Sequence, residues 1–180
     1  MTVRTHTRHA LLLGVTALLA TGMLTACSFG GGEARPSGTT GAERSHIEAA
    51  DAIAELPGIT SAEISSSTEG TPNQVMLFAR VSAEAGYAGA PAELLDYVVR
   101  QAWSTTENEP TTTVRVELTV EGQDLDLVAL AAEIGLAGTV NTKNKYDSSV
   151  RIRVDDVAAA YGTWPGPVPT PPASLTGAAG

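Results

Sequence analysis

Residues 111–121 read TTTVRVELTVE and contain the clearest secondary-structure signal in the sequence. The apolar residues that fall on one side of an extended chain are Val114, Val116, Leu118 and Val120. The opposite side carries Arg115, Glu117, Thr119 and Glu121. This strict alternation predicts a strand with one buried face and one solvent-exposed face. Such strands are typical of antiparallel sheets that helices cover on one side only, so the stretch favours an α+β fold.

Three further stretches alternate less strictly and complete the predicted sheet. Residues 59–68 and 74–82 are joined by the turn cluster Glu69–Asn73, so we expect a hairpin. A polar loop, residues 141–145, leads to the last strand. The apolar residues that alternate there are Tyr146, Val150, Ile152 and Val154. We therefore expect about four strands, mostly antiparallel.

Helices are predicted between these strands from capping residues and helical spacing. Ser45 and Glu48 have the spacing of a capping box, and Pro91 suits the first turn of a second helix. The residues that can cap the remaining two helices are Asp124 and either Asp155 or Asp156. The predicted order is α-β-β-α-β-α-β-α, a two-layer sandwich with the helices on one face of the sheet.

We expect the folded domain to occupy residues 43–161, with a tether before it and a tail after it. Residues 27–42 are rich in glycine, serine and threonine and show no apolar periodicity, which indicates a flexible tether. Residues 162–180 are rich in proline and have too few apolar residues to form a core. We therefore expect this tail to be disordered.

The N-terminal region has the features of an export signal. Residues 1–26 contain a basic start, an apolar run and a short stretch of small and polar residues. The stretch ends in Leu24-Thr25-Ala26-Cys27, and Cys27 is the only cysteine in the chain. These four residues resemble the bacterial lipobox. The resemblance implies that Cys27 receives a thioether-linked diacylglycerol and that the signal peptide is cut immediately before it.

The lipobox and the high content of alanine and glycine together resemble the small lipoproteins of actinobacteria. That resemblance implies a protein held at the extracytoplasmic face of the cell membrane by the lipid on Cys27, with no other cofactor. The α-β-β arrangement that begins at Ser45 is also similar to BON domains, which are envelope modules associated with membrane attachment. Ile59–Val81 carries this similarity, and the later strands depart from the pattern.

The charge of the chain excludes some classes of partner. The formal net charge is −9, and loss of Arg4 and Arg8 with the signal peptide removes two positive charges, which brings it to −11. An acidic surface repels phosphate backbones and anionic headgroups, so we expect no nucleic-acid binding. With one cysteine, the chain cannot form an internal disulfide.

The sequence offers little for catalysis or for metal binding. The only histidine after processing is His46, in the first turn of a helix, where we expect a solvated side chain rather than a general base. Helix capping explains the acidic pairs Asp124 with Asp126 and Asp155 with Asp156. The first pair lacks the further oxygen ligands that Ca²⁺ or Mg²⁺ needs. We therefore expect no enzyme, no catalytic residues and no metal site.

Three side chains are candidates for contact with a ligand or partner. Arg151 and Arg153 share one strand face, where they can bind a carboxylate or phosphate. Alternatively, they balance Glu117 and Glu121 on a neighbouring strand. Trp103 either lies at the edge of the core or lines a ligand cleft between the second helix and the sheet.

Together these features favour a non-enzymatic, lipid-anchored envelope protein that binds another protein or a cell-wall component. The alternative is a carrier or sensor of a small apolar ligand held between the helices and the sheet. The two hypotheses predict different interiors. A large apolar cavity would favour the carrier, whereas a solid core with a flat exposed surface would favour the interaction module.

Overall fold

The computed structural model describes residues 43–139 and 149–177, and it has the α+β fold that the strand pattern predicts. Its helices are α1 (His46–Ala54), α2 (Pro91–Trp103), α3 (Leu127–Glu133) and α4 (Val154–Tyr161). Its strands are β1 (Ile59–Thr68), β2 (Val75–Ala83), β3 (Thr113–Val120), β4 (Gly138–Thr139) and β5 (Ser149–Arg153). The predicted signal peptide, the lipobox with Cys27 and the tether lie outside the described residues.

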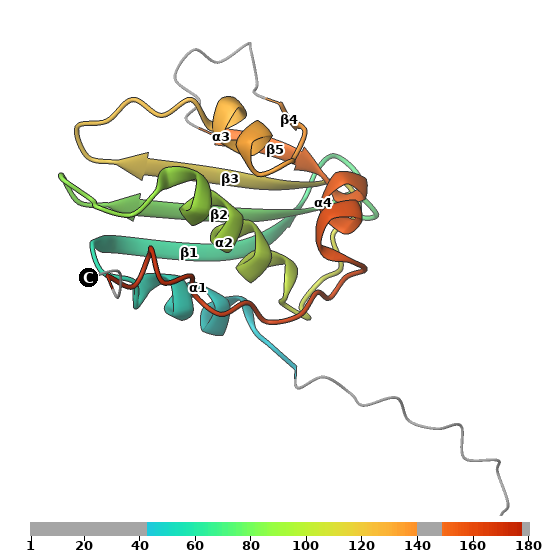
Figure 1. Cartoon of the computed structure of the whole chain (residues 1–180). Helices are drawn as coiled ribbons and strands as arrows, with labels where there is room; N and C mark the ends of the chain where they lie inside the picture. The colour runs from blue at the N-terminus through green and yellow to red at the C-terminus, as the bar shows by residue number, and fades with distance from the viewer. Residues whose placement is uncertain (1–42, 140–148, 178–180) are drawn as a thin grey trace, which may run out of the picture. The chain divides into compact units, whose positions relative to one another are not determined.

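The strands form one mixed sheet in the order β1-β2-β3-β5-β4 (Figure 1). β1 and β2 form the expected antiparallel hairpin, with Ile64 opposite Ala79. β5 is antiparallel to both of its neighbours. β2 and β3, however, are parallel, so the sheet is mixed and has one parallel pair within the mostly antiparallel arrangement that we expected. The cause is α2, because a helical crossover returns the chain to run in the same direction as the strand before it.

β4 is the strand that the sequence analysis did not predict. It consists of Gly138 and Thr139, which pair with Ile152 and Arg151 of β5. Two residues cannot display the alternation by which a strand is recognised. The glycine permits the close approach, because a Cβ atom at Gly138 would lie 2.6 Å from Cγ2 of Val150.

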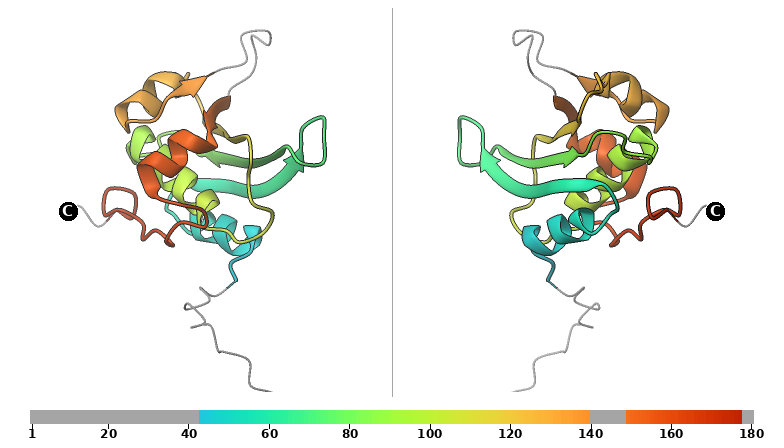
Figure 2. Two further views of the ribbon diagram at one scale, coloured as in Figure 1. Left: turned by 90° about the vertical axis from the view of Figure 1, so that its right-hand side faces the viewer. Right: turned by 90° about the vertical axis from the view of Figure 1, so that its left-hand side faces the viewer.

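The helices lie on one side of the sheet, and no helix of the described residues covers the other side (Figure 2). The core lies between the helices and the sheet. Large side chains from both layers are fully buried there: Ile53, Leu94 and Leu95 from the helices, and Leu77, Leu118 and Ile152 from the strands. The apolar side of residues 111–121 faces this core as predicted, because its four residues are at most 2% exposed.

The helix starts agree with the sequence prediction at α1 and α2. Ser45 and Glu48 form the capping box of α1, and Pro91 is the first residue of α2. At α3 the cap is Asp126 rather than Asp124. The Oδ1 atom of Asp126 accepts two backbone N–H groups of the first turn, at 3.1 and 3.0 Å.

The start of α4 also differs from the prediction. The helix follows β5 directly, so Arg153 occupies the cap position and no side chain caps the helix. Asp155 and Asp156, which were expected as caps, lie in the first turn instead. Carboxylates in that turn still interact favourably with the helix dipole.

The C-terminal tail differs most from the sequence expectation. Residues 162–180 were expected to be disordered, but residues 162–177 lie against α2 and α1 (Figure 1, dark red). The indole Nε1 of Trp103 donates to the carbonyl of Gly162 at 2.9 Å, and Leu175 is only 2% exposed. A proline-rich segment cannot form its own core, but it can dock on an existing surface because its backbone has little conformational entropy to lose.

Candidate functional site

The side of the sheet without helices presents a continuous polar and aromatic surface, which we call the open face. It consists of the outward side chains of Glu63, Phe78, Arg80, Arg115, Glu117, Thr119 and Arg151. The guanidinium groups of Arg80 and Arg115 lie over the ring of Phe78, at 5.0 and 5.5 Å from its centroid. These cation–π contacts hold the planar groups close to the sheet.

Ion pairs order the arginines of the open face further. Arg80 lies between Glu63 and Glu117, with nitrogen–oxygen distances of 3.6 and 3.3 Å. One of the two interpretations of Arg151 and Arg153 paired them with Glu117 and Glu121, but Glu117 pairs with Arg80 of β2. Arg115 donates from Nε to the Ser149 hydroxyl at 2.9 Å. The surface is therefore an ordered network rather than a set of freely moving charges.

The structure places the two predicted contact arginines at the β5 side of this surface. Arg151 lies opposite Arg115 in the pairing of β3 with β5. Its Nη1 atom is 3.2 Å from the carboxylate of Glu69 in the turn between β1 and β2. Arg153 pairs with Asp155 at 3.1 Å, and both side chains are largely exposed. Arg151 thus belongs to the open face, whereas Arg153 lies at its margin.

Basic residues are concentrated on this side of the domain. Within the described ranges, the lysine and arginine residues are Arg44, Arg80, Arg100, Arg115, Arg151 and Arg153. All except Arg44 and Arg100 belong to β2, β3 and β5 and point away from the helices. Neither Phe78 nor Arg80 was predicted to be a contact residue. The sequence signal that could have identified them is Phe78, an aromatic residue on the same face of the strand as Arg80.

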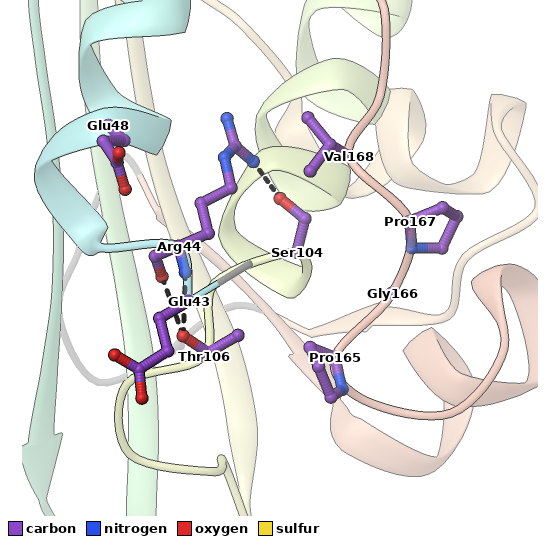
Figure 3. Close-up of a pocket in the computed structure, with 9 residues that line it drawn as sticks. All are labelled: Glu43, Arg44, Glu48, Ser104, Thr106, Pro165, Gly166, Pro167 and Val168. Carbon is purple, nitrogen blue, oxygen red and sulfur yellow. Dashed lines mark hydrogen bonds between the residues drawn. The ribbon is translucent and has the colours of Figure 1, made fainter. Parts of the chain in front are cut away.

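A second candidate site is a pocket of about 470 Å³ between the start of α1, the end of α2 and the tail (Figure 3). We call it the Arg44 pocket. Its lining residues are Glu43, Arg44, Glu48, Ser104, Thr106, Pro165, Gly166, Pro167 and Val168. The side chain of Arg44 extends between Glu48 of α1 and Val168 of the tail. The pocket therefore has a charged wall on one side and an apolar wall on the other.

Arg44 is fixed at both its backbone and its side chain. Its N–H donates to the Thr106 hydroxyl at 2.9 Å, and the Thr106 N–H donates to its carbonyl at 2.9 Å. Its guanidinium donates to the hydroxyl of Ser104 and to Oε1 of Gln101. Burial lowers the pKa of Arg44. Within the described residues, no carboxylate forms an ion pair with this guanidinium.

Glu48, on the charged wall, is held by the capping box. Its Oε2 atom accepts the backbone N–H of Ser45 at 2.8 Å and the Ser45 hydroxyl at 3.0 Å. These hydrogen bonds from Ser45 lower the pKa of Glu48. Glu48 is therefore a carboxylate at neutral pH, and its Oε2 atom already accepts the two hydrogen bonds from Ser45.

Trp103, a candidate for a ligand cleft between α2 and the sheet, is buried beneath the tail. It is 3% exposed. Its carbonyl accepts the N–H of Gly166 at 3.0 Å, and a Cβ atom at Gly166 would lie only 2.7 Å from its Cδ1. Trp103 thus holds the tail in place and supports the floor of the Arg44 pocket through Gly166. It does not itself line that pocket.

His46 is buried, in contrast to the solvated side chain that we expected. It is 7% exposed, and its Nδ1 atom lies 3.2 Å from Oε2 of Glu107. The backbone N–H of His46 donates to the other carboxylate oxygen at 3.0 Å. Among the described residues, none forms a hydrogen bond with Nε2 of His46. The His46–Glu107 contact ties the start of α1 to the loop after α2.

Residues 43–139 and 149–177 contain neither a metal-binding cluster nor a membrane-spanning helix. No group of three or more histidine, cysteine, aspartate or glutamate residues is positioned to hold a metal ion there. None of the helices in these ranges combines the length and apolar character of a membrane span. Cys27 and the lipobox lie outside these ranges.

Comparison with known proteins identifies no relative: no family model matches the chain, and neither a curated protein nor a solved structure is detectably similar to it.

Proposed function

We propose that this protein is a lipid-anchored lipoprotein of the bacterial cell envelope, and that its folded domain is a non-enzymatic interaction module. Cys27 carries a diacylglycerol that holds the protein at the extracytoplasmic face of the membrane. The open face of the domain then binds another envelope protein.

The anchor is supported by the N-terminal sequence. A basic start, an apolar run and Leu24-Thr25-Ala26-Cys27 follow one another in the order that lipoprotein processing requires. A single acyl chain gives only reversible membrane binding, whereas two chains provide a stable anchor at roughly 0.8 kcal/mol for each buried methylene group. Because the chain is acidic, it has no strong affinity of its own for the membrane. The lipid on Cys27 therefore supplies the membrane affinity.

The observation that carries the proposal is the open face. Arginine and aromatic residues are enriched at protein interfaces, and they supply much of the binding energy there. Phe78 lies beneath the guanidinium groups of Arg80 and Arg115 in this arrangement. Because the arginines are already ordered, binding costs little side-chain entropy. The chemistry fits a partner surface on which carboxylates alternate with apolar side chains.

The alternative of a carrier for a small apolar ligand needs space between the helices and the sheet. Side chains from both layers fill that region: Ile53, Leu77, Leu94 and Val116 are each 0% exposed. The Arg44 pocket lies outside this layer, against the tail. A filled core beside an exposed surface supports the interaction module.

The proposal is tested in cells by membrane fractionation and chemical crosslinking. Cys27→Ala should move the protein from the membrane fraction to a soluble or unprocessed form, because the thiolate is the only site for the lipid. Thr119→Glu should lower the yield of a crosslinked complex, because it adds a negative charge to the exposed surface of β3.

The matched control is Ala132→Glu, which adds the same charge on an exposed position of α3. Circular dichroism establishes that both variants are folded. Unchanged membrane fractionation of Cys27→Ala would refute the anchor. Equal complex yields from Thr119→Glu and the wild type would refute the open face as the binding surface.

A further inference from the structure

The tail is fixed at two places and spans open space between them. At its start, the carbonyl of Gly162 accepts the indole N–H of Trp103 at 2.9 Å, and the N–H of Gly166 donates to the Trp103 carbonyl at 3.0 Å. Near its end, Leu175 is buried, and the Ser174 hydroxyl donates to the carboxylate of Glu93. Between these places, residues 165–171 line two cavities together with residues of α1 and α2 or of the segments next to them. The tail therefore acts as the outer wall of a cleft.

Two adjoining cavities make up this cleft, and they share Arg44 and Val168. One is the Arg44 pocket, of about 470 Å³. The other has a volume of about 420 Å³ and extends along α1 and α2 to Leu56 and Tyr97. Cavities of this size match the lower part of the range for small-molecule sites. Arg44 thus lines both cavities, and each is large enough for a small ligand.

The guanidinium of Arg44 has the features of an anion-binding group. Its two recorded partners, Ser104 and Gln101, are neutral acceptors. They orient the guanidinium without neutralising it, and the nearby carboxylate of Glu48 interacts with it electrostatically but forms no ion pair with it within the described residues. A guanidinium has five N–H donors, so further donors remain for a ligand. A planar guanidinium with adjacent free N–H groups can bind both oxygens of a carboxylate at once.

The other residues that line the Arg44 pocket limit which kind of anion it can bind. Glu43 and Glu48 line the same pocket as Arg44, so a dianion such as phosphate would be repelled more strongly than a single carboxylate. A ligand that also carries an ammonium group would be attracted to these carboxylates. Pro167 and Val168 present an apolar surface beside the guanidinium. The pocket therefore fits a small zwitterion with a carboxylate and apolar groups.

We propose that the Arg44 pocket binds the free carboxylate end of a short peptide, with Arg44 holding the carboxylate and Pro167 and Val168 contacting the last side chain. This site is separate from the open face and does not depend on the proposed partner. It assigns a role to the ordered tail, which supplies the apolar wall.

The test is a fluorescence titration of the full-length lipoprotein in detergent micelles, with trialanine as the probe. The peptide has no aromatic group, so the emission of Trp103 and Trp164 reports on the tail. We expect a saturable change with trialanine. Trialanine amide, which lacks the carboxylate, should bind about tenfold more weakly or worse, because a charge-assisted pair is lost. Inorganic phosphate should give no saturable change.

Two variants distinguish binding from folding. Arg44→Gln should abolish binding, and thermal unfolding shows whether the variant is folded. Val168→Glu changes a side chain that is 61% exposed, so the fold should be unaffected. It should still weaken trialanine binding at least about tenfold by placing a carboxylate beside the site.

The control is Arg153→Gln, which removes an exposed arginine at the margin of the open face and should bind trialanine as the wild type does. Equal affinity for trialanine and its amide would overturn the proposal. So would the absence of saturable binding to the wild type, or full binding by a folded Val168→Glu variant.

Discussion

Tyr161 joins α4 to α2 through one carboxylate and one guanidinium. Its hydroxyl donates to Oδ1 of Asp96 at 2.7 Å, and Nε of Arg100 donates to Oδ2 of the same carboxylate at 2.7 Å. The guanidinium of Arg100 lies 4.2 Å from the centroid of the Tyr161 ring. Burial, followed by the hydrogen bond to Asp96, raises the pKa of Tyr161 well above its ordinary value.

This raised pKa predicts a loss of stability in alkaline solution. The pKa of Tyr161 in the folded state lies above the unfolded value of about 10. Its contribution is therefore fully present below a pH of about 10 and is lost as the pH rises through the folded pKa. Burial also raises the pKa of Tyr87 and of Tyr97, which adds to the same loss.

Tyr161→Phe should lower the free energy of unfolding at neutral pH by about 1–2 kcal/mol, because the hydrogen bond to Asp96 is removed. The variant should also lose less stability than the wild type between a pH of about 9 and about 11. Urea unfolding at both pH values measures the two effects. An identical pH dependence in variant and wild type would contradict the role given to Tyr161.

Among the elements, the tail is the one whose order depends on a few buried contacts. Leu175 is 2% exposed and belongs to the main core cluster. Leu175→Ala should lower the free energy of unfolding by about 2–5 kcal/mol, because it removes buried methyl groups and leaves a cavity. Leu175→Met, which preserves most of the volume, should cost less than about 1.5 kcal/mol.

Chemical denaturation measures these differences, and limited proteolysis shows whether the tail has detached. If the tail docks as described, Leu175→Ala should be cleaved within the tail sooner than Leu175→Met. Equal stability of the alanine variant and the wild type would show that the tail does not contribute to the core.

Local sequence patterns predicted the elements that depend on neighbouring residues. The alternation in residues 111–121 identified β3, and the spacing of Ser45 and Glu48 identified the start of α1. The parallel pairing of β2 with β3 could not be predicted in this way, because a half-buried strand alternates identically beside a parallel or an antiparallel neighbour. The docking of Leu175 was missed for a related reason, since its partners are remote in the sequence.

The candidate sites were predictable only in part. Arg151 was identified from its strand pattern, and it does lie on the open face. Phe78 and Arg80 were not identified, because their proximity to Arg115 depends on the register between β2 and β3. Arg44 shows no periodicity at all. Its environment is formed by Ser104 and by the tail, and contacts of this range leave no local signal in a sequence.

For the whole molecule, the net charge conceals an uneven distribution. The chain carries −9 overall, yet three of the six basic residues in the described ranges lie on the open face, and Arg153 lies at its margin. The helical side bears exposed carboxylates, among them Asp51 and Glu55 of α1 and its cap. An acidic partner protein would therefore meet more basic side chains on the open face than on the helical side. This asymmetry predicts that the partner protein binds at the open face.

Site-specific photo-crosslinking in cells tests that central claim most directly. A benzophenone amino acid replaces Thr119 on the open face or Ala132 on the exposed side of α3, with Cys27 intact in both chains. We predict a discrete crosslinked complex from position 119, and none from position 132. Equally strong crosslinking from positions 119 and 132 would contradict the proposal that the open face binds an envelope protein. The absence of a crosslinked complex from both positions would contradict it as well.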